Sequence, residues 1–307
     1  MSSLSGYDRP NYYLGIDGGG TKTDFALADE KGTLLRRITL DASNPNDVGF
    51  PQTEKILQNG ITMACEGIDL TSVSVFAGLA GCSSAENAPR IYNFLKQFPF
   101  SNIQNDNDAK NAIAASLGKR DGVTVVMGTG SIVYAKNKDA LYRIGGYGYL
   151  FGDEGSGFSL GKDAILAALR QEDGSGAPTL LHDYVKDQCA GDTVLSKIDV
   201  FYRDGKKEIA KYAPLVFKAF QNGDAVACKI LTQNIATIAE MISAAADKLE
   251  RASGTVTVVL CGGLCAQKEI LIPLLHSALK NDNRTYQIEI CTDPPVIGAL
   301  RMAGMPY

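Results

Sequence analysis

The segment Ile16-Asp17-Gly18-Gly19-Gly20-Thr21-Lys22-Thr23 decides the fold class of this chain. An apolar run, residues 12–16, leads into it, and residues 23–28 then alternate in polarity with the period of two that is typical of a strand. A dinucleotide-binding turn needs a helix after its glycines, and a Walker-type loop needs Gly-Lys-Ser/Thr at the start of a helix. The segment therefore predicts a β-hairpin turn.

This turn has the residue types of a phosphate-binding loop. Its three glycines let backbone N–H groups approach an anion closely, and Thr21 and Lys22 add polar donors. Asp17, at the end of the first strand, is suited to hold the Mg²⁺ that accompanies ATP, through water. The structural alternative is a bare hairpin turn that Asp17 caps.

The pattern occurs a second time, which favours the phosphate loop over the bare turn. Residues 123–127 form an apolar run, Gly128-Thr129-Gly130-Ser131 follows, and residues 132–135 resume a strand pattern. The repeat predicts two related α/β domains that face each other across a cleft. We expect a first domain at 1–117 and a second at 118–307, with the helix from about 296 returning to pack on the first domain.

Composition excludes several classes of partner. The chain has 307 residues and a net charge of −4, with 45% hydrophobic and 21% charged residues, which is ordinary for a globular protein. No Lys/Arg run is long enough to follow a nucleic-acid backbone, and the pair Lys206-Lys207 is expected to be a solvated helix start. We also expect no membrane partner, since no apolar run approaches the ~20 residues that span a bilayer.

The cysteines and histidines limit the kinds of disulfide, metal site and catalytic triad that the chain can form. The seven cysteines are odd in number and scattered and, with no recognisable signal peptide, they predict reduced thiols and a cytoplasmic protein. The two histidines, His182 and His276, have no Cys or carboxylate at metal-ligand spacing, which argues against zinc and against a Ser-His-Asp triad. If the protein is an enzyme, carboxylates would have to provide general acid–base catalysis. The oligomeric state stays open, a homodimer being the commonest arrangement among homomeric enzymes.

Two aspartates are candidates for that work. Asp106 and Asp108 lie where a strand that opens at Ile103 gives way to a helix over residues 109–117. Phosphoryl transfer to an alcohol needs a carboxylate at the attacking hydroxyl. The structural alternative is that Asp108 only caps the helix, because Asp is a preferred N-cap residue.

Four segments resemble the BadF/BadG/BcrA/BcrD ATPase family of the actin/hexokinase/heat-shock-70 superfamily. They are residues 16–23, 127–131, 259–264 and 294–300. The resemblance implies an α/β fold of two actin-like (ribonuclease H-like) domains around an ATP-binding cleft. It further implies that both glycine turns bind the ATP phosphates and that Gly262 and Gly263 contact adenosine. The structural alternative for these two glycines is a simple strand-to-helix turn.

Within that family, two stretches are similar to the N-acetylglucosamine kinases. Asn107-Asp108-Ala109 resembles the segment that carries their general base, which implies this role for Asp108, with Asp106 as the less favoured alternative. The loop from Gly145 to Ser156 resembles their Gly-Gly-aromatic-Gly and Gly-Asp-Glu-Gly-Ser sugar loop. The aromatic residue there is commonly Trp, and in this chain it is Tyr147.

The same resemblance implies a set of sugar contacts. They are Asn44, Gly81, Asp108, Thr129, Gly146, Tyr147 and Asp153. A carboxylate such as Asp153 suits this task because it accepts hydrogen bonds from two hydroxyls. The structural alternative is that Asp153 starts the next helix. Asn46 stands where the family has an aromatic residue, so the identity of the sugar stays open.

The resemblance implies an ATP- and Mg²⁺-dependent kinase that phosphorylates an amino sugar at its 6-hydroxyl. N-acetylglucosamine is the first candidate, with N-acetylmuramic acid and glucosamine as alternatives.

A second interpretation is an ATPase activator of a 2-hydroxyacyl-CoA dehydratase or benzoyl-CoA reductase, whose iron–sulfur cluster needs cysteine ligands. Cys261 and Cys265 flank the expected adenosine site and are badly placed for that cluster. A third interpretation is a non-catalytic sugar sensor on a kinase fold, against which Asp108 and both phosphate loops argue.

Overall fold

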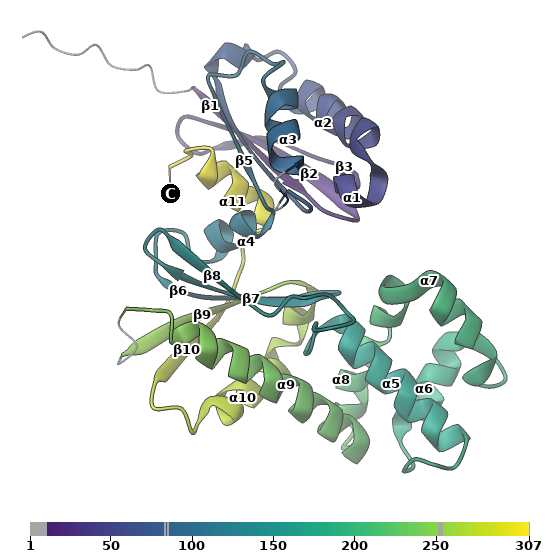
Figure 1. Ribbon diagram of the computed structural model, residues 1–307. Helices are drawn as coiled ribbons and strands as arrows, with labels where there is room; N and C mark the ends of the chain where they lie inside the picture. The colour runs from purple at the N-terminus through teal and green to yellow at the C-terminus, as the bar shows by residue number, and fades with distance from the viewer. Residues whose placement is uncertain (1–10, 83, 85, 251–253, 307) are drawn as a thin grey trace, which may run out of the picture. The chain divides into compact units, whose positions relative to one another are not determined.

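The computed structural model describes residues 11–82, 84, 86–250 and 254–306, which fall into two compact units (Figure 1). Unit 1 comprises the residues up to Lys119 together with those from Cys291 onward, and unit 2 runs from Arg120 to Ile290. The sequence predicts a boundary at residue 117/118 and a helix from about 296 that returns to the first domain. In the structure the segment from Cys291 onward belongs to unit 1.

Unit 1 is built on a five-stranded mixed sheet with the order β3-β2-β1-β4-β5. Its strands are β1 (Tyr12–Gly18), β2 (Lys22–Asp29), β3 (Leu34–Asp41), β4 (Val73–Leu79) and β5 (Asn102–Asp106). β2 pairs antiparallel with both β1 and β3, whereas β4 pairs parallel with β1 and β5. The turn from Gly18 to Lys22 is therefore a hairpin connection, as its polarity pattern predicts.

Unit 2 repeats this topology with the order β10-β9-β6-β7-β8. Its strands are β6 (Gly122–Met127), β7 (Ser131–Asn137), β8 (Ala140–Ile144), β9 (Thr255–Cys261) and β10 (Thr285–Ile290). β7 is antiparallel to β6 and β8, and β9 is parallel to β6 and β10. Each strand of unit 2 thus has a counterpart in unit 1, and the second glycine turn joins β6 to β7 as the first joins β1 to β2.

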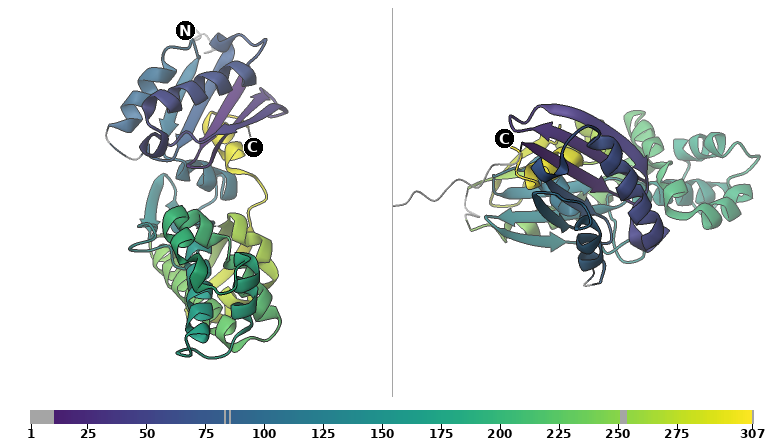
Figure 2. Two further views of the ribbon diagram at one scale, coloured as in Figure 1. Left: turned by 90° about the vertical axis from the view of Figure 1, so that its right-hand side faces the viewer. Right: turned by 90° about the horizontal axis from the view of Figure 1, so that it is seen from above.

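Helices cover both faces of the unit 1 sheet, with α11 and α4 on the side opposite α2 (Figures 1 and 2). The helices are α1 (Pro45–Val48), α2 (Phe50–Ala64), α3 (Asn87–Leu95), α4 (Ala109–Ser116) and α11 (Pro295–Met302), with a 3₁₀ turn η1 (Leu70–Ser72). The alternation of β1 divides the core, since Leu14 and Ile16 pack towards α2 and α3 while Tyr13 packs against α11.

Gly15 allows α11 to approach the sheet. A Cβ at this position would lie 2.6 Å from the backbone N of Leu300 and 2.8 Å from the backbone O of Val296. Both are main-chain atoms that no rotamer change could move. The C-terminal helix is therefore docked on β1, immediately before the residues of the first glycine turn.

Unit 2 carries a larger set of helices. They are α5 (Gly157–Glu172), α6 (Leu180–Cys189), α7 (Ile198–Ala210), α8 (Ala213–Gln221), α9 (Ala225–Ala246) and α10 (Lys268–Leu279), with 3₁₀ turns η2 (Leu195–Lys197) and η3 (Gly263–Gln267). The right-hand view of Figure 2 shows the teal and green helices α5–α8 as a group beside the sheet. α7 is broken at Gly205, whose φ is 63° and ψ −145°.

Helix α9 corrects the expectation that no segment of the chain is long and apolar enough to span a bilayer. Its 22 residues have a mean hydropathy of 1.2 over their most apolar stretch, which is long and apolar enough to cross a membrane. Its buried residues, among them Ile230, Leu231, Ile235 and Ile238, belong to the hydrophobic core of unit 2. α9 packs there against α8, α10 and the strands, so it serves as a core helix of this unit.

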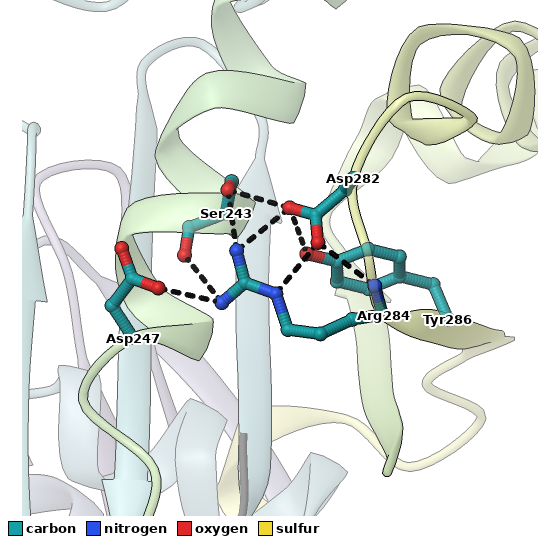
Figure 3. A network of polar contacts seen from close by, with 5 residues as sticks. All are labelled: Ser243, Asp247, Asp282, Arg284 and Tyr286. Atoms are coloured by element: carbon teal, nitrogen blue, oxygen red, sulfur yellow. Dashed lines mark hydrogen bonds and ion pairs between the residues drawn. The ribbon is translucent and has the colours of Figure 1, made fainter. Parts of the chain in front are cut away.

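A polar network fastens β10 to the C-terminal end of α9 (Figure 3). Arg284 donates to Asp282 at 2.7 Å, to the hydroxyl and the carbonyl of Ser243, and to Asp247 at 2.8 Å. Tyr286 donates its hydroxyl to Asp282 at 2.8 Å. Hydrogen bonds from Arg284 hold the pKa of Asp282 far below its usual range, and burial raises the pKa of Tyr286 to about 12. The start of the edge strand is thereby tied to the end of α9.

Candidate active site

The first glycine turn is closed by its own backbone. The Gly19 N–H donates to the carbonyl of Lys22 at 2.9 Å, and the Gly18 carbonyl accepts from Ala80 N–H at 2.7 Å. Thr21 and Lys22 are exposed at the tip. The ammonium of Lys22 contacts the buried carboxylate of Asp24 at 2.7 Å. The turn therefore presents backbone and hydroxyl donors, while the charge of Lys22 is shared with Asp24.

Asp17 is a carboxylate that lacks a matching cation. Its Oδ1 accepts from Asn111 Nδ2 at 2.7 Å, and in the described part of the chain it forms no ion pair. Burial is the main cause that raises its pKa from 3.8 to about 6, and the negative charges of Asp108 and Asp24 add to the rise. A divalent cation would remove this penalty, so the residues fit a Mg²⁺ ion here.

Asn111 is a site residue that the sequence analysis missed. Its side chain is fully buried on α4 and donates to the carbonyls of Ile16 and Gly78 as well as to Asp17. Gly78 leaves the space that the amide occupies. The amide thus joins the ends of β1 and β4 and orients the Asp17 carboxylate. The available signal was an Asn three residues after Asp108, directly before the apolar run of residues 112–115.

Asp106 and Asp108 have different side-chain contacts in the structure. Asp106 Oδ2 forms an ion pair with Lys110 at 2.6 Å, and its Oδ1 accepts from Asn107 N–H at 2.7 Å. Asp108 precedes α4 without making a side-chain capping bond to it. The Asn107 side chain accepts from Ala109 N–H at 3.0 Å instead. Asp108 occupies the N-cap position of α4 without a side-chain capping bond, and a backbone hydrogen bond with Ala109 partly offsets the effect of burial on its pKa.

The environment of Asp108 suits a proton acceptor. Burial raises the pKa of its carboxyl above the ordinary value. It lies close enough to Asp17 for the two negative charges to repel, which is one cause of the raised pKa of Asp17. A carboxylate with a raised pKa is a stronger base than an ordinary aspartate. Unit 1 thus holds two carboxyl groups, those of Asp17 and Asp108, whose pKa values are raised by burial.

Asn44 and Gly81 lie side by side in unit 1. Asn44 caps α1, accepting from Asn46 N–H at 3.1 Å and donating to Asp47 at 2.8 Å. Gly81 has a φ of 83°, and a Cβ there would collide with the Asn44 side chain. Asn87 links the two loops by donating to Asn46 and to the Gly81 carbonyl. Two of the three predicted sugar contacts of this unit, Asn44 and Gly81, thus belong to one polar cluster.

The second glycine turn is coupled to the predicted adenosine glycines. The Gly128 N–H donates to the Gly130 carbonyl at 2.9 Å, and Thr129 is exposed at the tip. Gly262 has a φ of 101°, and a Cβ there would lie 2.5 Å from the carbonyl oxygen of Met127. The turn after β9 therefore touches the residue that leads into the second glycine turn. Gly263 begins η3 and has open space beside it.

The sugar loop of unit 2 holds Asp153 in an unusual conformation. Asp153 has a φ of 66°, and its side chain is only 5% exposed. Its Oδ1 accepts from Ser131 N–H at 3.2 Å, and Lys206 contacts its Oδ2 at 2.6 Å. α5 begins after the N-cap Ser156, so Asp153 does not start that helix. The expectation that Lys206 is merely solvated is wrong, because it pairs with this buried carboxylate.

The rest of the loop is more open. Gly146 has a φ of 69°, and Arg143 donates to the carbonyls of Gly145 and Gly146. Tyr147 is 67% exposed, with the Arg143 guanidinium 5.6 Å from its ring centre. These residues lie on an exposed loop, the part of a fold where binding residues are disproportionately found.

Comparison with known proteins decides the family. The model of the BadF/BadG/BcrA/BcrD ATPase family matches residues 14–301. The chain belongs to this family. The match extends through both units and confirms the resemblance that the four segments indicate.

Relatives of this family member are named as amino-sugar kinases. An N-acetylmuramic acid/N-acetylglucosamine kinase of Clostridium acetobutylicum is 31% identical, over 82% of this chain and 85% of that protein. An N-acetyl-D-glucosamine kinase of Dictyostelium discoideum is 27% identical, over 95% of this chain and 97% of its own length. Glucosamine kinase GspK of Vibrio cholerae is 29% identical, over 74% and 78%.

Solved structures agree on the fold. A candidate N-acetylglucosamine kinase from Chromobacterium violaceum superposes with a TM-score of 0.76 at 26% identity, covering 95% of this chain and 99% of that one. A ROK family glucokinase from Streptomyces griseus, crystallised with glucose and AMPPNP, gives 0.59 at 18% identity, over 95% and 98%. The second likeness shows the fold alone. The predicted class, two actin-like α/β domains, is confirmed.

Proposed function

We propose that this family member is an ATP-dependent kinase that phosphorylates the 6-hydroxyl of an amino sugar, with Asp108 as general base. The observation that carries the proposal is the state of Asp108. Burial raises its pKa, its side chain makes no capping bond to α4, and the neighbouring Asp106 is already paired with Lys110. Among the two aspartates of this segment, only Asp108 is thus available to a hydroxyl.

N-acetylglucosamine is the proposed substrate, with N-acetylmuramic acid and glucosamine as the alternatives. The support comes from relatives that are named for these three sugars. Asn44 and Gly81 of unit 1 supply an amide and a backbone carbonyl for sugar hydroxyls. In unit 2 we propose the same role for Thr129, Gly146, Tyr147 and Asp153.

The proposed reaction is a direct phosphoryl transfer. Asp108 accepts the proton of the sugar hydroxyl as its oxygen bonds to the γ-phosphorus of ATP. The bond from that phosphorus to the bridging oxygen breaks, and ADP leaves with both bonding electrons. Because such transfer is catalysed mainly by positioning and electrostatics, the raised pKa of Asp108 and the donors of the glycine turns are the contributions expected from the chain.

ATP and Mg²⁺ have separate proposed contacts in the chain. The turn from Gly18 to Lys22 and the turn from Gly128 to Ser131 each offer backbone donors to phosphate oxygens, and Gly262 and Gly263 offer open backbone to adenosine. Asp17 would hold Mg²⁺ through water, held in place by Asn111. The ion, when bound, offsets the negative charge of the phosphates.

We also propose that the protein is cytoplasmic. None of the seven cysteines, all within the described residues, forms a disulfide; five are buried, and burial raises the pKa of Cys65 to about 12 and that of Cys82 to about 11. Thiols with such pKa values are unreactive. This pattern agrees with a protein that folds without disulfides in a reducing compartment.

The proposal is tested by a coupled ADP-release assay over a panel of hexoses and hexosamines. The panel contains N-acetylglucosamine, N-acetylmuramic acid, glucosamine, N-acetylmannosamine and glucose, each with ATP and Mg²⁺. We expect turnover with at least one of the first three and a product with phosphate on the 6-oxygen, identified by NMR. Equal, slow ADP release with every sugar and with none would reject the kinase function.

A further inference from the structure

Lys206 reaches the second glycine turn from a distant part of the fold. It belongs to α7, whereas the turn lies between β6 and β7 and Asp153 lies in the loop before α5. Its Nζ contacts Asp153 Oδ2 at 2.6 Å. The backbone break at Gly205, directly before it, redirects the chain at this point. A Cβ at Gly205 would meet no atom within 4 Å, so glycine is required there for its dihedral angles and not for space.

The ion pair lies against the turn itself. A Cβ on Gly130 would be 2.8 Å from Asp153 Oδ1 and 2.9 Å from Lys206 Nζ. Asp153 Oδ1 also accepts from Ser131 N–H, and the Ser131 hydroxyl donates to the Glu154 carbonyl at 2.6 Å. The second glycine turn is thus backed by a buried carboxylate whose charge is balanced by one ammonium group.

This charge balance matters for a polyanionic ligand. A buried carboxylate beside a turn that binds phosphates repels them strongly, because the local dielectric constant is low. We propose that Lys206 is a positioning residue that neutralises Asp153 and so allows the turn from Gly128 to Ser131 to bind the phosphates of ATP. This inference rests on the proposed function of that turn and adds a residue on which nucleotide affinity depends.

The structure offers a matched control on the same helix. Lys207 follows directly, is exposed, and carries the same charge. Replacing either lysine by Met changes the net charge of the protein equally. A difference between the two variants therefore reports the pairing with Asp153 and not the general field of the protein.

The test is the dissociation constant of a non-hydrolysable ATP analogue with Mg²⁺, measured by calorimetry without sugar. Lys206→Met is expected to weaken binding by about tenfold or more, because it leaves Asp153 charged beside the turn. Lys206→Arg keeps the charge and is expected to bind normally, and Lys207→Met is expected to stay within about twofold of wild type. The double variant Lys206→Met/Asp153→Asn removes both charges and is expected to regain most of the lost affinity.

The double variant separates charge balance from a merely structural role. If it binds as weakly as Lys206→Met alone, or if Lys206→Met binds like wild type, the inference is overturned. Should Lys206→Met fail to fold in a thermal melt, Lys206→Gln replaces it. Glutamine is uncharged and leaves Asp153 without its cation, so the same loss of affinity is expected and an unchanged affinity overturns the inference.

Sugar turnover distinguishes this inference from the proposed function. A wild-type protein that phosphorylates a sugar, with a Lys206→Met variant of normal nucleotide affinity, would refute only the role of Lys206. A wild-type protein that binds the ATP analogue but phosphorylates none of the panel sugars would refute only the kinase assignment. A wild-type protein that binds no nucleotide would refute both.

Discussion

Replacing Asp17 by Asn is expected to stabilise the nucleotide-free protein at neutral pH. The folded state keeps this carboxylate largely out of water and near two other negative charges, which raises its pKa from 3.8 to about 6. That difference corresponds to about 3 kcal/mol by which ionisation of Asp17 lowers the free energy of unfolding. Asn has nearly the same shape, and its amide oxygen still accepts from Asn111.

The pH dependence has a definite sign. Above about pH 6 the Asp17 carboxyl is ionised in both the folded and the unfolded state, so the folded state bears the whole cost. As the pH falls from about 6 to about 4, the folded state takes up a proton first and the cost disappears. Asp17→Asn should therefore raise the free energy of unfolding, obtained from urea titration, by up to about 3 kcal/mol at pH 8 and change it little at pH 4.

Asp24, on the adjacent strand, supplies the control. Burial alone would raise its pKa, but hydrogen bonds from Lys22 and Thr39 outweigh this and lower it. Asp24→Asn should accordingly destabilise the protein at pH 8, and the difference should fade as the pH drops below the ordinary pKa of aspartate. Urea unfolding followed by circular dichroism, in EDTA and without nucleotide, measures the change in the free energy of unfolding for both variants. A destabilising Asp17→Asn at pH 8 would refute the charge argument for the metal site.

Three further predictions follow from the packing. Gly15→Ala should lower the free energy of unfolding by about 2 kcal/mol because its Cβ would press on the main chain of α11, and limited proteolysis should then release the C-terminal segment. Arg284→Met should cost about 2 kcal/mol in urea unfolding, since Asp282 and Ser243 lose their donor, and hydrogen exchange of β10 should increase. Asn111→Leu should cost about 2 to 3 kcal/mol by leaving buried carbonyls unsatisfied, and should raise further the pKa of Asp17 read from NMR titration.

Much of the fold is predictable because its signal is local. A strand, a glycine turn and a second strand occur twice in the sequence, and the structure has the same two hairpins. β8 escaped prediction for a physical reason. It is an edge strand whose first four residues are exposed, so it carries no alternation of apolar and polar residues. The return of α11 to unit 1 was expected from the sequence, whereas its close docking depends on Gly15, which reads as an ordinary strand residue.

In the candidate site, too, local motifs are predictable from the sequence and contacts between distant residues are not. The glycine turns and Asp108 are recognisable as short motifs. The features that give them chemical character are contacts between distant residues, such as Asn111 with Asp17 and Lys206 with Asp153, which are 94 and 53 residues apart. Lys206 looks like a surface lysine until the break at Gly205 is known. The pairing of Asp106 with Lys110 is the exception, because its spacing of four residues on a helix start is visible in the sequence.

The central claim, that Asp108 and not Asp106 is the general base, is tested most directly by comparing turnover in two single variants. Asp108→Asn keeps the shape of the side chain and removes the proton acceptor, so kcat with the preferred amino sugar should fall by about 10²–10⁴-fold while the affinity for the ATP analogue stays unchanged. Asp106→Asn breaks only a half-exposed ion pair with Lys110 and should keep kcat within about threefold of wild type. Near-normal turnover by a folded Asp108→Asn protein, or a large loss confined to Asp106→Asn, would contradict the account.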